Sequence, residues 1–128
     1  MILLDTCTFI WLTTDPKQLS KDTLGLIENS EQIWLSAISA LEIGTKIRKG
    51  KLRLHTPLAE WLEKSLRYYG ITESPITIPI ATLATELPPI HSDPADRILI
   101  ATALVNKLTL LTPDEKIRSY PHVKTLWS

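Results

Sequence analysis

Four acidic residues are spaced so that an α/β fold would bring their carboxylates together. Asp5 and Asp114 come at or just after the ends of short apolar runs, and Glu42 and Asp96 lie early in predicted helices. Carboxylates that converge repel one another and take up protons. A bound divalent cation removes this penalty, so the pattern indicates a metal site if the four positions meet.

The ligand types favour a hard cation. Carboxylate oxygens without convincing cysteine or histidine partners are typical of Mg²⁺ or Mn²⁺ sites. Such ions bridge phosphate oxygens and activate water, so hydrolysis of a phosphodiester is the chemistry that follows. No residue stands out as a protein general base. The one cysteine, Cys7, cannot form an internal disulfide or a thiolate zinc site, which favours a reducing cytoplasm.

Short apolar runs alternate along the chain with segments of helical periodicity. We predict strands at 2–4, 32–36, 76–78, 108–112 and 123–126, and helices at 9–12, 20–29, 37–49, 57–70, 81–87, 94–107 and 114–118. Thr56 is the expected cap of the fourth helix, with Pro57 in its first turn. The alternation predicts an α/β fold, a three-layer α/β/α domain around a mostly parallel sheet of four or five strands. Ligands bind such sheets beyond the carboxyl ends of the strands, where the acids are expected.

Length and composition fit a soluble, single-domain protein. The 128 residues suit one domain spanning 1–128, with 44% hydrophobic and 22% charged residues. No stretch approaches the roughly 20 apolar residues that cross a bilayer, and Asp5 interrupts the N-terminus before any signal-peptide pattern develops. The net charge is zero, so RNA binding would depend on a local basic patch.

One such basic cluster follows Glu42. Five cations without an intervening acid are Lys46, Arg48, Lys49, Lys51 and Arg53. Cations are favoured at a helix C-terminus, which is a sufficient structural explanation. The same cluster is able to hold an RNA backbone, through Lys46, Arg48 and Lys49 in particular. Arg97 is a further candidate, either steadying a phosphate or pairing with a neighbouring acid.

Four segments in order resemble the PIN-domain nucleases, and specifically the VapC toxins of bacterial type II toxin–antitoxin pairs. These segments are ILLDTCTFIWL, SAISALEIGTKIRKGKL, LPPIHSDPADRILIATA and LTLLTPDEKIRSY, which together span nearly the whole chain. The resemblance implies a metal-binding, catalytic set at Asp5, Glu42, Asp96 and Asp114. It also implies cleavage of RNA, often tRNA or rRNA, a homodimer, and a cognate antitoxin that masks the site. Cys7 departs from the family, because many members carry histidine there.

Each of the four acids also has a structural explanation. Asp5 is able merely to cap the backbone of Thr6 and Cys7. Asp114 is suited to capping the short helix that follows it, and Asp96 fits the third helical position of a capping-box variant. Glu42 stands four residues before Lys46, the spacing of a surface ion pair. Register with the family motif favours the metal role for Glu42 and Asp96, and the resemblance favours it for Asp5. For Asp114 the alternative to the cap is a peripheral role, holding a second metal or orienting a water.

Several neighbours of the acids are second-shell candidates. Asp93 with Pro94 is a helix cap and first turn, so we assign Asp93 that structural role and Asp96 the metal role, with Asp93 as the alternative. The hydroxyls of Thr6 and Thr112 adjoin two acids and are suited either to orienting them or to ordinary turn bonding.

Two other functions remain open from the residues. An aspartate at the end of a first strand is compatible with an aspartyl-phosphate phosphotransferase, but the haloacid-dehalogenase pattern places a second aspartate where this chain has Cys7. A PIN-like module that binds RNA or an antitoxin without cleaving is the other alternative.

Overall fold

Five parallel strands form a single sheet in the order β3-β2-β1-β4-β5. The computed structural model describes residues 1–89 and 92–127. The strands are β1 (Ile2–Leu4), β2 (Ile33–Ser36), β3 (Ile71–Ser74), β4 (Thr109–Leu111) and β5 (Thr125–Leu126). All four strand pairs are parallel, which confirms the predicted sheet and its number of strands.

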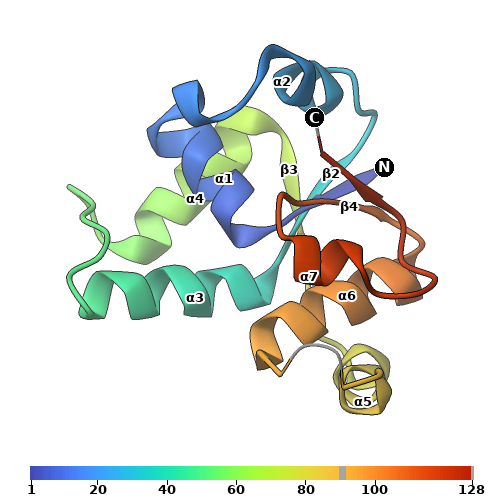
Figure 1. Ribbon diagram of the computed structural model, residues 1–128. Coiled ribbons are helices and arrows are strands. Elements are labelled where there is room, and N and C mark those ends of the chain that lie inside the picture. Colours follow the sequence, from blue (N-terminus) through green and yellow to red (C-terminus); the bar gives the residue numbers. More distant parts are fainter. Residues whose placement is uncertain (90–91, 128) are drawn as a thin grey trace.

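Helices cover both faces of this sheet (Figure 1). They are α1 (Thr6–Thr14), the 3-10 turn η1 (Pro16–Gln18), α2 (Lys21–Glu28), α3 (Ala37–Arg48), α4 (Leu58–Tyr69), α5 (Ile78–Glu86), α6 (Pro94–Asn106) and α7 (Glu115–Arg118). One apolar cluster joins the sheet to α1, α2, α3 and α4, and a second joins it to α5, α6 and α7. The three-layer α/β/α architecture is therefore confirmed. No helix among the described residues is long and apolar enough to cross a membrane.

The two clusters follow from the alternation of side chains along each strand. Leu3 and Leu110 belong to the cluster under α5 and α6, whereas Leu4 and Leu111 belong to the cluster under α1 and α3. Successive strand residues point to opposite faces of a sheet, so strands buried on both sides are apolar throughout. The parallel sheet thus explains why β1 reads as an uninterrupted apolar run.

The predicted strand at 76–78 was wrong. The third strand lies earlier, at Ile71–Ser74, directly after the left-handed Gly70 that ends α4. Ile78 instead begins α5, because the Thr77 hydroxyl accepts a hydrogen bond from the Ile80 amide and caps the helix. Three β-branched residues at 76–78 favour a strand locally, but helix capping decides the outcome.

Several helix boundaries also differ from the prediction. The first helix starts at Thr6 rather than residue 9, because Asp5 caps it. The fourth begins at Leu58, where Pro57 occupies the cap position without a side-chain hydrogen bond, so Thr56 is not its cap. The fifth starts three residues earlier than expected, at Ile78. These shifts leave the order of elements unchanged.

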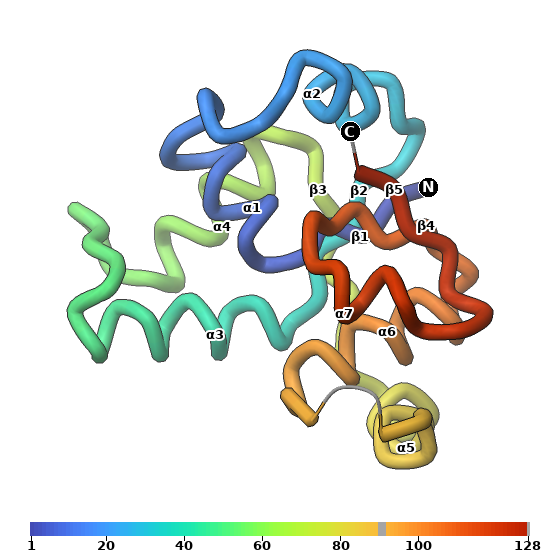
Figure 2. The backbone as a smooth tube through the Cα atoms, viewed as in Figure 1, coloured from blue at the N-terminus to red at the C-terminus, as the bar shows by residue number. Residues whose placement is uncertain are grey.

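The strand register determines which residues share the carboxyl edge of the sheet. Leu4 pairs with Leu35 of β2 on one side and with Leu111 of β4 on the other. The residues that follow these three strands therefore emerge side by side, although they are far apart in the sequence. Figure 2 shows this arrangement along the backbone, with β4 lying beside the N-terminal β1.

Candidate functional site

Asp5 is held at this edge by hydrogen bonds to both of its carboxylate oxygens. Its Oδ1 accepts from the Thr8 amide at 2.7 Å, and its Oδ2 accepts from the Thr112 hydroxyl at 2.5 Å. Asp5 is 5% exposed. Asp5 therefore does cap the backbone, but through the Thr8 amide at the start of α1 and not through Thr6 or Cys7. The cap uses one oxygen of a carboxylate that is buried at the edge of the sheet.

Glu42 reaches the same edge from helix α3. Its Oε1 accepts a short hydrogen bond from the Thr6 hydroxyl, and Thr6 in turn lies 2.8 Å from the Ser39 hydroxyl. Lys64 pairs with Glu60 and Arg67 with Glu63, whereas no ion pair joins Glu42 to Lys46. The surface ion pair suggested by the i,i+4 spacing thus does not form, and Glu42 points toward α1.

Asp114 both caps α7 and faces the edge of the sheet. Its Oδ1 accepts from the amides of Lys116 at 2.8 Å and Ile117 at 3.4 Å. Its own amide donates to the Thr112 hydroxyl at 3.1 Å, and that hydroxyl donates to Asp5. Thr112 therefore links the two acids, which agrees with the orienting role considered for it.

Asp93 and Asp96 occupy different positions within one helical turn. Asp93 is the N-cap of α6 and accepts from the Ala95 amide at 2.9 Å, which confirms its structural role. Asp96 lies in the first turn of α6 and lines the acidic cavity described below. His91, at the start of this motif, falls outside the described residues.

All four predicted acids line a single cavity of about 210 Å³. Its walls are Asp5, Thr6, Cys7, Glu42, Asp96, Leu99, Pro113 and Asp114. No lysine or arginine of the described residues is among them. Four carboxylates from four separate segments of the chain therefore meet at the carboxyl edge of the sheet, as the ligand-binding rule for open α/β folds predicts.

Burial and mutual repulsion perturb the titratable groups of this cavity. Burial raises the pKa of Asp5 above its ordinary value of 3.8, against the lowering effect of the hydrogen bonds from Thr112 and Thr8. Burial likewise raises the pKa of Glu42, which the Thr6 hydrogen bond lowers and the charges of Asp93 and Asp5 raise further. The pKa of the Cys7 thiol is raised by burial and by Asp5. The cavity thus carries negative charge at a cost, which a cation would remove.

The donor chemistry fits a hard divalent cation. The ionisable groups around the cavity are carboxylates and one thiol whose pKa is raised. Among the described residues, however, no three carboxylate, thiol or imidazole groups stand close enough to form a ready-made ligand set. Small movements of the side chains, with water filling the remaining positions, suit Mg²⁺, which usually keeps several waters.

Arg97, predicted either to steady a phosphate or to pair with a neighbouring acid, makes hydrogen bonds to the backbone. Its guanidinium donates to three backbone carbonyls, those of Ala84 at 2.8 Å, Leu87 at 2.6 Å and Pro88 at 3.1 Å. It also donates to the Tyr120 hydroxyl at 3.2 Å. Arg97, on α6, therefore links this helix by hydrogen bonds to the end of α5 and to the loop after α7.

The basic cluster lies at the end of α3, on the same helix as Glu42. Lys46 is one turn from Glu42, and its charge acts on both Glu42 and Cys7. Arg48 and Lys49 are exposed at the helix end, which closes through a hydrogen bond from the Lys51 amide to the Lys46 carbonyl. The left-handed Gly50 permits this closure. The cluster is thus both a stabilised helix end and a neighbour of the acidic cavity.

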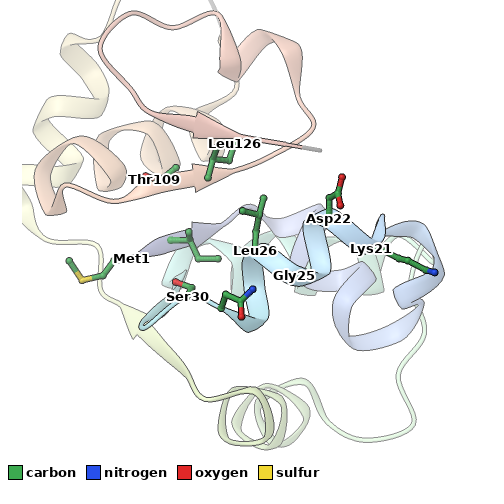
Figure 3. Close-up of a pocket in the computed structure, with 10 residues that line it drawn as sticks. Met1, Lys21, Asp22, Gly25, Leu26, Ser30, Thr109 and Leu126 are labelled. Carbon is green, nitrogen blue, oxygen red and sulfur yellow. The ribbon is translucent and has the colours of Figure 1, made fainter.

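Four larger cavities among the described residues are each lined by at most two acids. One of about 630 Å³ lies between α2 and the β4–β5 edge (Figure 3). Its charged side chains, Lys21 and Asp22, gather at one end of it. Size alone therefore does not identify the site, whereas convergence of acids does.

Two residues of the site were missed from the sequence. Ser39 is fully buried and contacts Thr6, and Thr8 supplies the amide that binds Asp5. The Thr8 amide follows from Asp5 being a helix cap, since caps bind the N2 or N3 amide. Ser39 has no comparable signal, because its partner lies 33 residues away.

The fold and the site together define an open, parallel α/β domain with an acidic cavity at the carboxyl ends of its central strands. Comparison with known families matches residues 2–123 to the PIN domain. The chain therefore belongs to the PIN-domain family.

Individual relatives narrow this assignment. The chain is 32% identical over 132 aligned residues to Ribonuclease VapC22 of Mycobacterium tuberculosis, covering 98% of each, and is a VapC homologue. Its fold is similar to a chain of VapBC2 from Rickettsia felis bound to a promoter DNA fragment, with a TM-score of 0.76, 17% identity and complete coverage of both. It is also similar to a chain of FitAcB from Neisseria gonorrhoeae, with a TM-score of 0.68, 23% identity, and 98% and 96% coverage.

Proposed function

We propose that this protein is a metal-dependent endoribonuclease that acts as the toxin of a toxin–antitoxin pair. The observation that carries the proposal is the cavity where Asp5, Glu42, Asp96 and Asp114 meet without a cationic side chain among them. The VapC relative, named a ribonuclease, supports RNA as the substrate. We expect it to work in the cytoplasm, where its lone thiol stays reduced.

The four acids would hold one or two Mg²⁺ or Mn²⁺ ions. When bound, such an ion supplies Lewis acidity, favouring deprotonation of a water nucleophile and neutralising charge on the phosphoryl oxygens. The chain's own residues position the ligands: Thr8 and Thr112 fix the Asp5 carboxylate, and Thr112 also anchors the Asp114 backbone. Both Asp5 oxygens accept hydrogen bonds, an arrangement that suits a fixed ligand better than the attacking nucleophile of a phosphotransferase.

Activity in Mg²⁺ and in EDTA, compared between wild type and Asp96→Asn, tests the proposal. We expect wild-type protein, freed of antitoxin, to cleave RNA only with the metal, and Asp96→Asn to lose at least about a hundredfold in rate, as removal of other charge-stabilising groups does. Asp93→Asn is the matched control, because asparagine caps a helix as well as aspartate and should retain activity. Cleavage of tRNA and rRNA by neither protein, in any metal, would favour the non-catalytic binding module.

The basic cluster on α3 is the proposed contact for the RNA backbone. Replacing Lys46, Arg48 and Lys49 together with glutamine is expected to raise KM about tenfold and to reduce the salt dependence of RNA binding, with kcat little changed. Replacing Lys17, Lys21 and Lys124 with glutamine gives a control variant of the same net charge as the first, and it should leave KM unchanged. Equal effects of the two triple variants would show that net charge, and not this patch, governs binding.

A cognate antitoxin and a second copy of the chain are the proposed protein partners. Structural neighbours include chains of VapBC2 and of FitAcB, and a further one comes from a structure described as a toxin–antitoxin complex from Klebsiella pneumoniae. These similarities support an antitoxin partner here. The homodimer rests on the family resemblance, and light scattering of the purified chain tests it.

A further inference from the structure

Two hydroxyl groups link helix α1 to the acid on helix α3. Thr6 and Ser39 are 4% and 0% exposed, and their hydroxyl oxygens lie 2.8 Å apart. The Thr6 hydroxyl also bonds to Oε1 of Glu42. All three residues are at the carboxyl edge of the sheet, and Thr6 and Glu42 line the acidic cavity.

The hydrogen bonds among Ser39, Thr6 and Glu42 can be donated in one direction only. An ionised carboxylate accepts hydrogen bonds and donates none, so Thr6 must donate its single hydroxyl proton to Glu42. Thr6 then has only acceptor capacity left, and the bond between the hydroxyls is donated by Ser39. Since Ser39 is fully buried, it gains by donating there, because a buried hydroxyl without a partner is costly.

We propose that Ser39 and Thr6 form a one-way hydrogen-bond relay that holds the Glu42 carboxylate at the cavity and sets the position at which Glu42 meets a divalent cation. This inference rests on the proposed function. Ser39 and Thr6 are positioning residues in it, acting through Glu42. Glu42 needs such support because it is only partly buried and its flexible side chain would otherwise sample several rotamers.

Mn²⁺ binding by the full-length chain, measured by calorimetry without RNA, tests the relay. Thr6→Val is expected to weaken binding about tenfold, in the range found when outer-shell partners of metal ligands are removed. Thr6→Ser keeps the hydroxyl and should restore binding to within about twofold of wild type. Thr13→Val is the matched control on α1, because the Thr13 hydroxyl bonds to carbonyls of its own helix. Wild-type affinity in a folded Thr6→Val protein would overturn the proposal.

Ser39→Ala tests the direction of the relay. As a single change, Ser39→Ala frees the Thr6 hydroxyl to rotate. It is expected to weaken Mn²⁺ binding about threefold, which is less than the roughly 10- to 100-fold loss typical of outer-shell changes. In a Thr6→Val background it should have no further effect, because Ser39 acts only through Thr6. Full additivity of the two losses would show that Ser39 acts independently and would overturn the relay.

A measurement in EDTA separates failure of the relay from failure of the proposed function. Thermal unfolding is compared for Thr6→Val, Glu42→Ala and the double variant. Thr6→Val should change Tm less in the Glu42→Ala background than in wild type, since the bond it breaks is already absent there. An equal change in both backgrounds would overturn the relay whatever the metal data show. Absence of Mn²⁺ binding by wild type, together with clear coupling in EDTA, would overturn the metal function and the positioning role while leaving the bond itself established.

Discussion

Asp5→Asn protein is expected to lose RNA cleavage and to become more stable in EDTA. Asp5 is the most deeply buried of the four acids, and it contributes a charge that a cation is proposed to balance. We expect cleavage to fall about a thousandfold or more, beyond the 10- to 100-fold typical of outer-shell changes. The stability gain follows because the neutral amide avoids the desolvation that raises the Asp5 pKa.

The sign of this stability effect depends on pH. The folded protein holds a proton on Asp5 at pH values where the unfolded chain, with an ordinary pKa of 3.8, has lost it. Stability therefore declines as pH rises from 3.8 through the raised folded pKa, and stays lower above it. Each unit of pKa elevation costs about 1.4 kcal/mol at neutral pH, or roughly 5 °C in Tm for a domain of this size.

Calorimetric unfolding of wild type and Asp5→Asn in EDTA, at pH 7 and near pH 3.5, measures the effect. The variant should be the more stable protein at pH 7, and the difference should shrink at the lower pH. Its amide oxygen is still able to accept from the Thr8 amide, so the cap of α1 is kept. Asp15→Asn, at an exposed position, is the control. A variant less stable than wild type at pH 7 would mean that the Thr112 hydrogen bond outweighs the cost of burial.

Arg97→Met is expected to destabilise the protein by about 3 kcal/mol, since hydrogen bonds to a charged group contribute roughly 1.5–3 kcal/mol and several are lost together. The variant keeps the aliphatic stem but removes the donors that satisfy three carbonyls at the end of α5. Arg97→Lys should not rescue the loss, because an ammonium is a point charge and does not reproduce the planar fork of donors. Urea unfolding measures the change.

Arg118→Met is the control for this prediction, because Arg118 is exposed on α7 and should change stability by less than about 0.5 kcal/mol. Tyr120→Phe provides a second check, since its hydroxyl both accepts from Arg97 and donates to Pro88. Well below its Tm, Arg97→Met should retain the KM for RNA within about twofold, far from the tenfold or greater loss of a phosphate contact. A stable variant with a much higher KM would restore the phosphate contact first considered for Arg97.

Local patterns were enough to predict most of the elements. The apolar runs at 2–4 and 108–112 became β1 and β4, because a strand buried on both faces has to be apolar throughout. Asp93 and Asp114 were recognisable as helix caps, and each accepts from an amide of its own helix. These features depend on neighbours within a few residues, so the sequence carries their signal directly.

The meeting of the acids was predictable only through the fold class. Asp5 and Asp114 follow strands, and the carboxyl ends of parallel strands share one edge, so their proximity follows from the βαβ pattern. Glu42 was ambiguous, because its spacing to Lys46 equally favours a surface ion pair. The family motif favoured the cavity for Glu42, and the bond from Thr6 is consistent with that choice.

Contacts between distant segments were decided by tertiary structure alone. Arg97 follows Asp96 in sequence, which suggested a role at the site, yet carbonyls 9 to 13 residues earlier and a tyrosine 23 residues later determine where its guanidinium points. Ser39 became part of the site because β1 and β2 are adjacent, which brings the starts of α1 and α3 together. Sequence by itself determined the caps, the buried strands and the supply of carboxylates. Only the packed fold decided their hydrogen-bond partners, because partner choice depends on distances between residues that no local pattern encodes.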